Sequence, residues 1–238
     1  MAFLSYLQSA RDLFYLEQDY PKAEAALRPY LKKSGLVLAE KRAIYELMGL
    51  VLRAQGKYEE ASSLYEHIQD NYQAGYSALL MGNMGKVQNS WTKVAAQREN
   101  HWCITLFGLV TRQLQSYPTL FQVRHHLESD IANLLNAGRT DYLENLLSYL
   151  DFLTQINLEC PKFVGRAMLH AGWMNRAGGY LMKGQKVLPN DPEIYFHLGQ
   201  YSAQLAQYSE ARLMLKQCLM ISPAYFPAKS LMESLPKN

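Results

Sequence analysis

A glycine, an alanine and a large apolar residue recur at fixed spacing in this chain and constrain its fold more than any other feature. Within residues 192–225, Gly199 is followed twelve positions later by Ala211, and Leu215 comes four positions after that. Apolar residues on both sides of Ala206 fall at the spacing of amphipathic helices. We expect two antiparallel helices that cross at Gly199 and Ala211, where small side chains let the backbones approach closely.

The same signature occurs in two further places. A shift of 34 positions places Gly165, Ala177 and Leu181 on the three residues above, and each second helix is closed by a proline, Pro189 or Pro223. A third copy lies far upstream, where the corresponding residues are Gly49, Ala61 and Tyr65. The Gly-to-Ala distance is twelve in all three copies. A helical protein without internal repeats would not keep that register.

These residues resemble the tetratricopeptide repeat, a helix–turn–helix unit of 34 residues. The resemblance implies an all-α protein, an α-α superhelix or right-handed solenoid of tetratricopeptide-like hairpins. Repeat arithmetic over the whole chain gives about 12–14 helices. No strand pattern competes anywhere.

The strength of the signature varies along the chain and suggests three segments. Residues 1–75 predict N-terminal tetratricopeptide-like hairpins, although Arg11 occupies the position where the other copies have glycine. Residues 76–157 are helical in pattern but poor in repeat signature, so we expect divergent hairpins that continue the stack or, alternatively, break it into two lobes. Residues 158–238 predict tandem repeats with a terminal helix.

Composition excludes several classes of function. The net charge of +3 is too small to indicate nucleic-acid binding, and no apolar run is long enough to span a membrane. Three widely spaced cysteines in apolar surroundings, Cys103, Cys160 and Cys218, predict buried thiols in a reducing compartment rather than disulfides. No secretory signal pattern is present at the N-terminus, so a cytoplasmic location is expected.

Charge is distributed in belts along the second half of the chain. Residues 127–161 carry one basic and six acidic groups, whereas 162–190 carry five basic and no acidic groups. Residues 191–238 are balanced, with four of each. The simplest interpretation is that neighbouring repeats complement one another electrostatically.

No arrangement of residues predicts an enzyme. The densest cluster of possible metal ligands is His125, His126, Glu128 and Asp130. Only His126 and Asp130 have the four-residue spacing that shares a helical face, and a closed metal site needs further ligands. We therefore expect this cluster to be solvated helix surface. No nucleophile, base and orienting group occur together, so no catalytic residue, metal site or cofactor is predicted.

The resemblance also implies a binding surface, because the first helix of each repeat lines the inner groove in this family. By position, the groove-lining residues are Lys162, Arg166, His170, Phe196, Gln200 and Gln204. Lys162 and Arg166 are four residues apart, which suits the capture of a carboxylate or an acidic peptide. Pairing with the preceding acidic belt, for example with Glu159, is the alternative. Neither cation occupies a core position of the repeat, so we expect neither to matter much for stability.

The resulting hypothesis is a non-enzymatic scaffold that binds a peptide segment of a partner protein in the concave groove, with an acidic segment as one option. The alternative is a structural or assembly subunit of a larger complex such as secretion, pilus or envelope machinery. RNA binding is disfavoured, because the chain lacks regularly repeated base-reading positions and strong positive charge.

Overall fold

The computed structural model describes residues 2–95 and 102–236, and within these ranges every regular element is a helix. Packing divides the chain into two compact units, Met1–Ile104 and Thr105–Asn238. The helices of the first unit are α1 (Ala2–Tyr15), α2 (Tyr20–Leu31), α3 (Leu38–Ala54), α4 (Tyr58–His67), α5 (Asn71–Met81) and α6 (Met84–Ala95). Helix α7 (Trp102–Thr111) spans the division.

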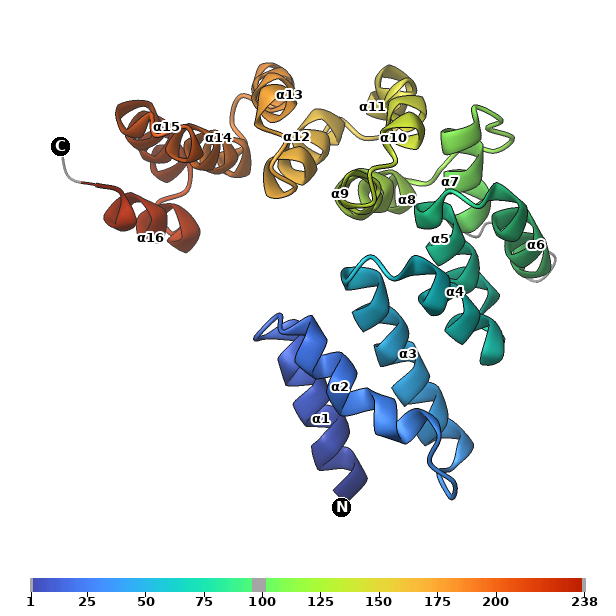
Figure 1. Cartoon of the computed structure of the whole chain (residues 1–238). Helices are drawn as coiled ribbons and strands as arrows, with labels where there is room; N and C mark the ends of the chain where they lie inside the picture. Colours follow the sequence, from blue (N-terminus) through green and yellow to red (C-terminus); the bar gives the residue numbers. More distant parts are fainter. Residues whose placement is uncertain (1, 96–101, 237–238) are drawn as a thin grey trace. The chain divides into compact units, whose positions relative to one another are not determined.

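The second unit continues the helical pattern to the C-terminus. Its elements are α8 (Leu120–His125), the π-helical turn η1 (His126–Asp130), α9 (Ile131–Asn136), α10 (Thr140–Leu147), α11 (Leu150–Ile156), α12 (Cys160–His170), α13 (Met174–Val187), α14 (Pro192–Gln204), α15 (Tyr208–Ile221) and α16 (Phe226–Ser234). In both units successive helices pair side by side, as α3 with α4 and α14 with α15 (Figure 1). The predicted all-α array of hairpins is confirmed.

The described residues form fifteen helices when α8, η1 and α9 are counted as one, slightly more than the predicted 12–14. Part of the excess arises where leucines from 143 to 153 follow one helical spacing, yet the structure divides this stretch into α10 and α11 around Ser148 and Tyr149. The three-segment division at residues 75 and 157 stays a prediction. Its first boundary falls inside α5, whereas the two compact units divide after Ile104.

Each repeat glycine lies against the large side chain that follows it by sixteen residues. A Cβ atom built on Gly199 would lie 2.8 Å from Leu215 side-chain carbons, and one on Gly165 would lie 2.7 Å from Leu181 Cγ. A Cβ atom on Gly49 would likewise collide with the Tyr65 ring. The predicted helix crossings are therefore confirmed, and only glycine fits them without displacing the facing side chain.

The hairpin of α5 and α6 is a fourth copy of this arrangement that the sequence pattern did not reveal. A Cβ atom on Gly75 would collide with the Trp91 indole. The position of the usual alanine is taken by Val87, which is fully buried. The signature was hidden because valine and tryptophan replace the alanine and the leucine or tyrosine of the other copies.

The hairpin turns also repeat, with one residue in the left-handed region seven positions after the crossing glycine. Gly56, Gly82 and Gly172 hold φ values of 75°, 85° and 79°, while Ala206 holds 58°. The residue after each turn residue donates its backbone N–H to a carbonyl five residues earlier, as Gln207 does to Ser202 at 2.9 Å. This Schellman arrangement satisfies the carbonyls at the helix end and fixes the return of the chain.

The first hairpin departs from the predicted register by one residue. Arg11 was expected at the glycine position, but Arg11 is exposed and Ala10 is fully buried in the core that also contains Leu27. The connection between α1 and α2 has four residues, against three between α3 and α4. The longer turn moves the small residue back by one position.

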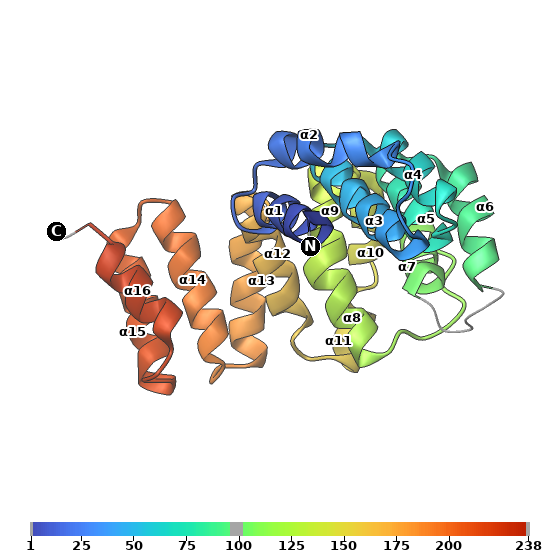
Figure 2. The same cartoon turned by 90° about the horizontal axis from the view of Figure 1, so that it is seen from below.

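The C-terminal helix α16 covers the end of the last hairpin. It packs against α14 and α15, and these three helices lie side by side in Figure 2. Arg212 on α15 donates hydrogen bonds to the carbonyl oxygens of Leu235 at 3.1 Å and Pro236 at 2.7 Å. These bonds satisfy carbonyls beyond the end of α16 and tie the helix to its neighbour.

We predict that Gly199→Leu destabilises the fold by about 1–3 kcal/mol or more, because the added side chain overpacks the contact with Leu215. Chemical denaturation followed by circular dichroism measures the change. Gly179→Ala is the matched control, since a Cβ atom there meets nothing within 4 Å. Removing glycine from that helix interior should stabilise by up to about 1 kcal/mol. An unchanged unfolding midpoint for Gly199→Leu would contradict the helix crossing.

Ala206→Gly should stabilise the protein by about 0.5–1 kcal/mol, because glycine adopts the left-handed turn conformation without the Cβ clash that alanine pays for. The reciprocal variant, Gly172→Ala, should destabilise the protein by a similar amount through backbone strain. Strain is the only contribution there, because an added Cβ atom would meet no neighbouring atom. Urea unfolding of both variants tests this pair. Shifts of the same sign would refute the equivalence of the two turns.

Candidate functional site

The six predicted groove residues lie on two helices of the second unit. Lys162, Arg166 and His170 follow one another at four-residue spacing on α12, and Phe196, Gln200 and Gln204 do so on α14. That spacing places each set on one face of its helix. Helices α12 and α14 contact each other directly. We call this surface the α12–α14 face.

Lys162 is buried and fully engaged within the chain. Its side chain is only 5% exposed, and Nζ lies 2.9 Å from Glu159 Oε2, 2.7 Å from Asp191 Oδ2 and 2.9 Å from Glu193 Oε2. Burial lowers the pKa of this ammonium group, but the bonds to Asp191, Glu159 and Glu193 outweigh burial and raise the pKa above its ordinary value. Lys162 is therefore a charged core residue that joins α12 to the start of α14.

Arg166 forms the second half of the same network. Its guanidinium pairs with Glu193 Oε1 at 2.6 Å on one side and with Glu128 of η1 on the other. Helices of three successive hairpins are thus linked through one arginine. The acidic belt before residues 162–190 supplies Glu128 and Glu159, and the start of the balanced segment after them supplies Asp191 and Glu193. Neighbouring repeats therefore complement one another electrostatically, as predicted.

Glu193 connects the network to two histidines. The His197 ring, whose Nε2 lies 3.5 Å from Glu193 Oε1, has the largest effect in holding the pKa of Glu193 well below its ordinary value, and Lys162 adds to it against the opposing effect of burial. His197 is buried, and its Nδ1 lies 2.8 Å from Gln200 Oε1. The His170 ring meets His197 edge-on at 6.0 Å. Burial, followed by the proximity of His197 and Arg166, lowers the pKa of His170.

One expectation about the two cations is wrong. Lys162 was expected outside the core, yet it is one of the few buried charged side chains among the described residues. The sequence placed it on a helical face but did not show that the N-terminus of α14 would cover that face. Two cations meet four carboxylates here, so a partner carboxylate would have to displace one of the chain's own. Capture of an acidic peptide by Lys162 and Arg166 stays a prediction.

The accessible part of the α12–α14 face lies toward the C-terminal ends of both helices. His170 and Gln204 are exposed, and Phe196 and Gln200 are half-buried. The Phe196 ring lies 5.3 Å from Tyr225 and 5.2 Å from His197. These side chains provide an aromatic edge and hydrogen-bonding groups above the ion-pair network, which suits contact with another polypeptide.

The expectation for the histidine cluster is also wrong. His126 and Asp130 were assigned to solvated surface, but their side chains are 0% and 2% exposed, with His126 Nδ1 and Asp130 Oδ2 2.6 Å apart. Their spacing correctly predicted a shared face, whereas the packing of η1 against α12 turned that face inward. Within the described residues no group of three or more His, Cys, Asp or Glu side chains could hold a metal ion.

The predicted burial of the three cysteines is confirmed. Cys103, Cys160 and Cys218 are free and buried, and burial raises the pKa of each thiol, to about 11, 12 and 11 respectively. Such thiols are poor nucleophiles at neutral pH. None of the described helices is both long and apolar enough to cross a membrane.

Comparison with known proteins adds a likeness of fold. The chain matches no protein-family model and no curated protein sequence. Among solved structures it is similar to a tetratricopeptide repeat protein from Parabacteroides merdae ATCC 43184, with 14% sequence identity, 97% of each chain covered and a TM-score of 0.44. No partner and no activity follow from this likeness.

Lys162→Met should destabilise the second unit by roughly 1–3 kcal/mol, because it leaves Glu159, Asp191 and Glu193 close together without their shared cation. We expect less than the roughly 3–5 kcal/mol of a fully buried pair, since these carboxylates keep some contact with water. Denaturant unfolding at neutral pH gives the change in free energy. A loss below the experimental error would contradict a buried network.

The pH dependence of this loss provides an independent check. The pKa of Glu193 is lower in the folded protein than in the unfolded chain, so its pairing stabilises the fold at neutral pH. This contribution is lost as the pH falls through the folded-state pKa. The difference between wild type and Lys162→Met should therefore shrink on acidification. A difference that grows in acid would show that repulsion among the carboxylates is not its cause.

Proposed function

We propose that this protein is a non-enzymatic interaction scaffold that holds a segment of a partner protein on the α12–α14 face. The proposal rests on one observation: two helices joined by ion pairs carry exposed side chains on the same faces. Lys162, Arg166 and Glu193 fix the two helices relative to each other, while His170 and Gln204 project from the same helical faces into solvent. A binding surface built on locked helices loses little conformational entropy on association.

The chemistry of the face favours a polypeptide partner. Four carboxylates surround the two cations, so the base of the face does not offer the excess positive charge that nucleic acids require. Amide and imidazole groups beside the Phe196 ring suit backbone hydrogen bonding and the packing of one apolar side chain. We propose the cytoplasm as the location, supported by three buried thiols that are free.

A second candidate function is that of a permanently docked subunit in a larger assembly. Two large apolar side chains near the C-terminal end favour it, since Met220 is 75% exposed and Phe226 is 74% exposed. Side chains of this kind are enriched at the centres of protein interfaces. In this alternative the terminal hairpin and α16, rather than the α12–α14 face, contact the partner.

The test is capture of binding proteins from a lysate of the source cell with the full chain as bait, followed by direct affinity measurement with the purified partner. The face variant is His170→Glu with Gln204→Glu. We expect it to weaken binding at least about tenfold, equivalent to about 1.4 kcal/mol, by placing two new charges where the partner lies. Both positions are exposed, so folding should not change.

The matched control is Met182→Glu with Leu213→Glu, which adds the same charge at exposed positions on α13 and α15. It should bind as wild type does. A third variant, Met220→Glu with Phe226→Glu, separates the two candidates. If only this third variant loses the partner, the permanently docked subunit is correct and the α12–α14 face is not the binding surface.

A further inference from the structure

A pocket lies entirely within the first unit and shares no residue with the α12–α14 face. It has a volume of about 960 Å³ and is formed where α2 ends, α3 begins and α4 ends. We call it the basic pocket. Most of its lining residues are basic, apolar or aromatic, with Ser34 and Gln69 as the uncharged polar ones. The lining residues that matter here are Lys32, Lys33, Leu38, Lys41, Arg42 and His67.

The positive charge of the basic pocket is largely uncompensated. None of its lining residues is Asp or Glu. Arg42 pairs with Glu46 at 2.8 Å, but no ion pair involves Lys32, Lys33 or Lys41 among the described residues. Lys33 instead places its Nζ 5.0 Å from the centre of the Tyr30 ring. Three ammonium groups are therefore free to meet an anion.

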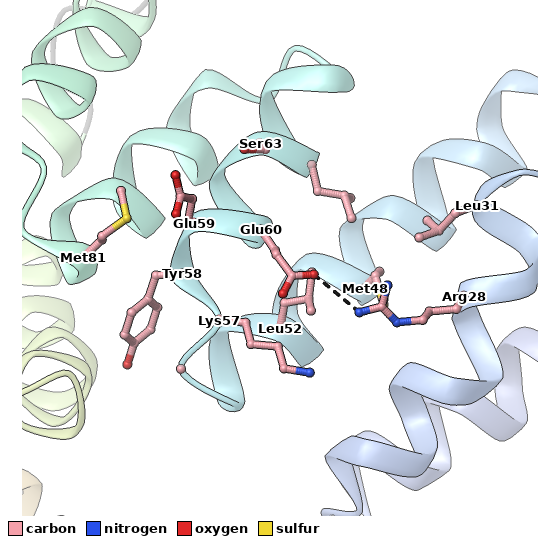
Figure 3. A pocket seen from close by; sticks show the side chains of 12 residues that line it. Arg28, Leu31, Met48, Leu52, Lys57, Tyr58, Glu59, Glu60, Ser63 and Met81 are labelled. Carbon is pink, nitrogen blue, oxygen red and sulfur yellow. Dashed lines mark hydrogen bonds and ion pairs between the residues drawn. The ribbon is translucent and has the colours of Figure 1, made fainter.

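In a neighbouring pocket of the same unit, the basic side chains form ion pairs with acidic side chains of the chain itself. That pocket, of about 780 Å³, is drawn in Figure 3 and contains Arg28, Lys57, Glu59 and Glu60. Arg28 pairs with Glu60 at 3.4 Å, and Lys57 pairs with Glu24 at 2.7 Å. Burial raises the pKa of Glu24, but hydrogen bonds from Lys57, Gln55 and Arg28 lower it to about 2. Its cations are neutralised by the chain itself, unlike those of the basic pocket.

Helix electrostatics explain only some of the basic residues. Lys32 follows α2 and His67 ends α4, where a cation is favourable next to the negative end of the helix dipole. Lys41 and Arg42 lie near the start of α3, where the dipole disfavours positive charge. Lys41 has no ion pair to offset this cost. Its position is thus not accounted for by stabilisation of its own helix.

Apolar groups lie beside these cations. Leu38 is 84% exposed at the first position of α3, and Leu31, Tyr45 and Ile68 also line the pocket. The Tyr45 ring stacks on His67 at 5.2 Å, which gives the wall a flat aromatic surface. Exposed leucine next to unpaired lysines is suited to a ligand that carries both negative charge and a large apolar side chain.

We propose that the basic pocket binds an acidic segment of a partner protein that carries a large apolar side chain between its carboxylates. The carboxylates contact Lys32, Lys33 and Lys41, and the apolar side chain packs against Leu38 and Tyr45. This surface goes beyond the function proposed above, because it involves the other unit and none of the same residues. Charge complementarity, rather than the presence of a pocket alone, selects the acidic partner.

The experiment measures fluorescence anisotropy of short synthetic peptides that alternate Glu with Leu or Phe, titrated with the full chain. The pocket variant is Lys33→Glu with Lys41→Glu, and the matched control is Lys86→Glu with Lys93→Glu, on α6, which changes the net charge equally. We expect wild type and control to bind alike and the pocket variant to bind at least about tenfold more weakly. Higher salt should weaken binding in wild type and control.

Other occupants give distinct results, each of which would overturn the proposal. Equal binding of inorganic phosphate, or of peptides with Glu but without Leu or Phe, would identify a site for small anions. Self-association of the chain in sedimentation that Lys33→Glu with Lys41→Glu abolishes would identify a second copy as the occupant. Absence of binding by every acidic peptide would show that the pocket takes no such segment. The His170→Glu with Gln204→Glu variant should still bind the peptides, so failure at one surface is distinguishable from failure at the other.

Discussion

The contact between a glycine and the large side chain sixteen residues later sets the geometry on which the rest of the structure depends. With no Cβ atom at Gly199 or Gly165, the second helix of the hairpin lies close enough for Leu215 or Leu181 to rest on the backbone of the first. Close approach buries the apolar stripe of both helices and makes the hairpin a unit that can be repeated. The turn residue in the left-handed region, seven positions after the glycine, fixes where the second helix begins.

Ion pairs between side chains join one hairpin to the next. Arg166 contacts Glu128 before it and Glu193 after it, and Lys162 reaches across to Asp191. Pairs of this kind contribute little when solvated, but a buried ammonium group shared by several carboxylates strongly disfavours any arrangement that breaks it. The network therefore fixes how α12 and α14 are placed and leaves their C-terminal ends available for contact.

Positive charge is neutralised within the chain at some sites and left without an ion pair at another. In the second unit, Lys162 and Arg166 are neutralised within the chain. In the first unit, Lys32 and Lys41 lie at a pocket whose lining has no acidic residue. A cation already neutralised adds little attraction for an acidic partner, whereas an unpaired one does. The sequence suggested Lys162 for such a role, which stays a prediction, and the basic pocket is the further surface that we propose for an acidic partner.

The sequence by itself determined the hairpins. Gly49, Gly165 and Gly199 predicted the crossings because twelve- and sixteen-residue spacings depend only on helix geometry and turn length. The hairpin at Gly75 and the shifted register at Ala10 were missed, because a change of side chain or one added turn residue hides the same packing. Spacing also showed that Lys162 with Arg166, and His126 with Asp130, share a helical face. Only the tertiary structure decided whether each face meets water or another helix, because that depends on residues distant in sequence, such as the α14 N-terminus over Lys162.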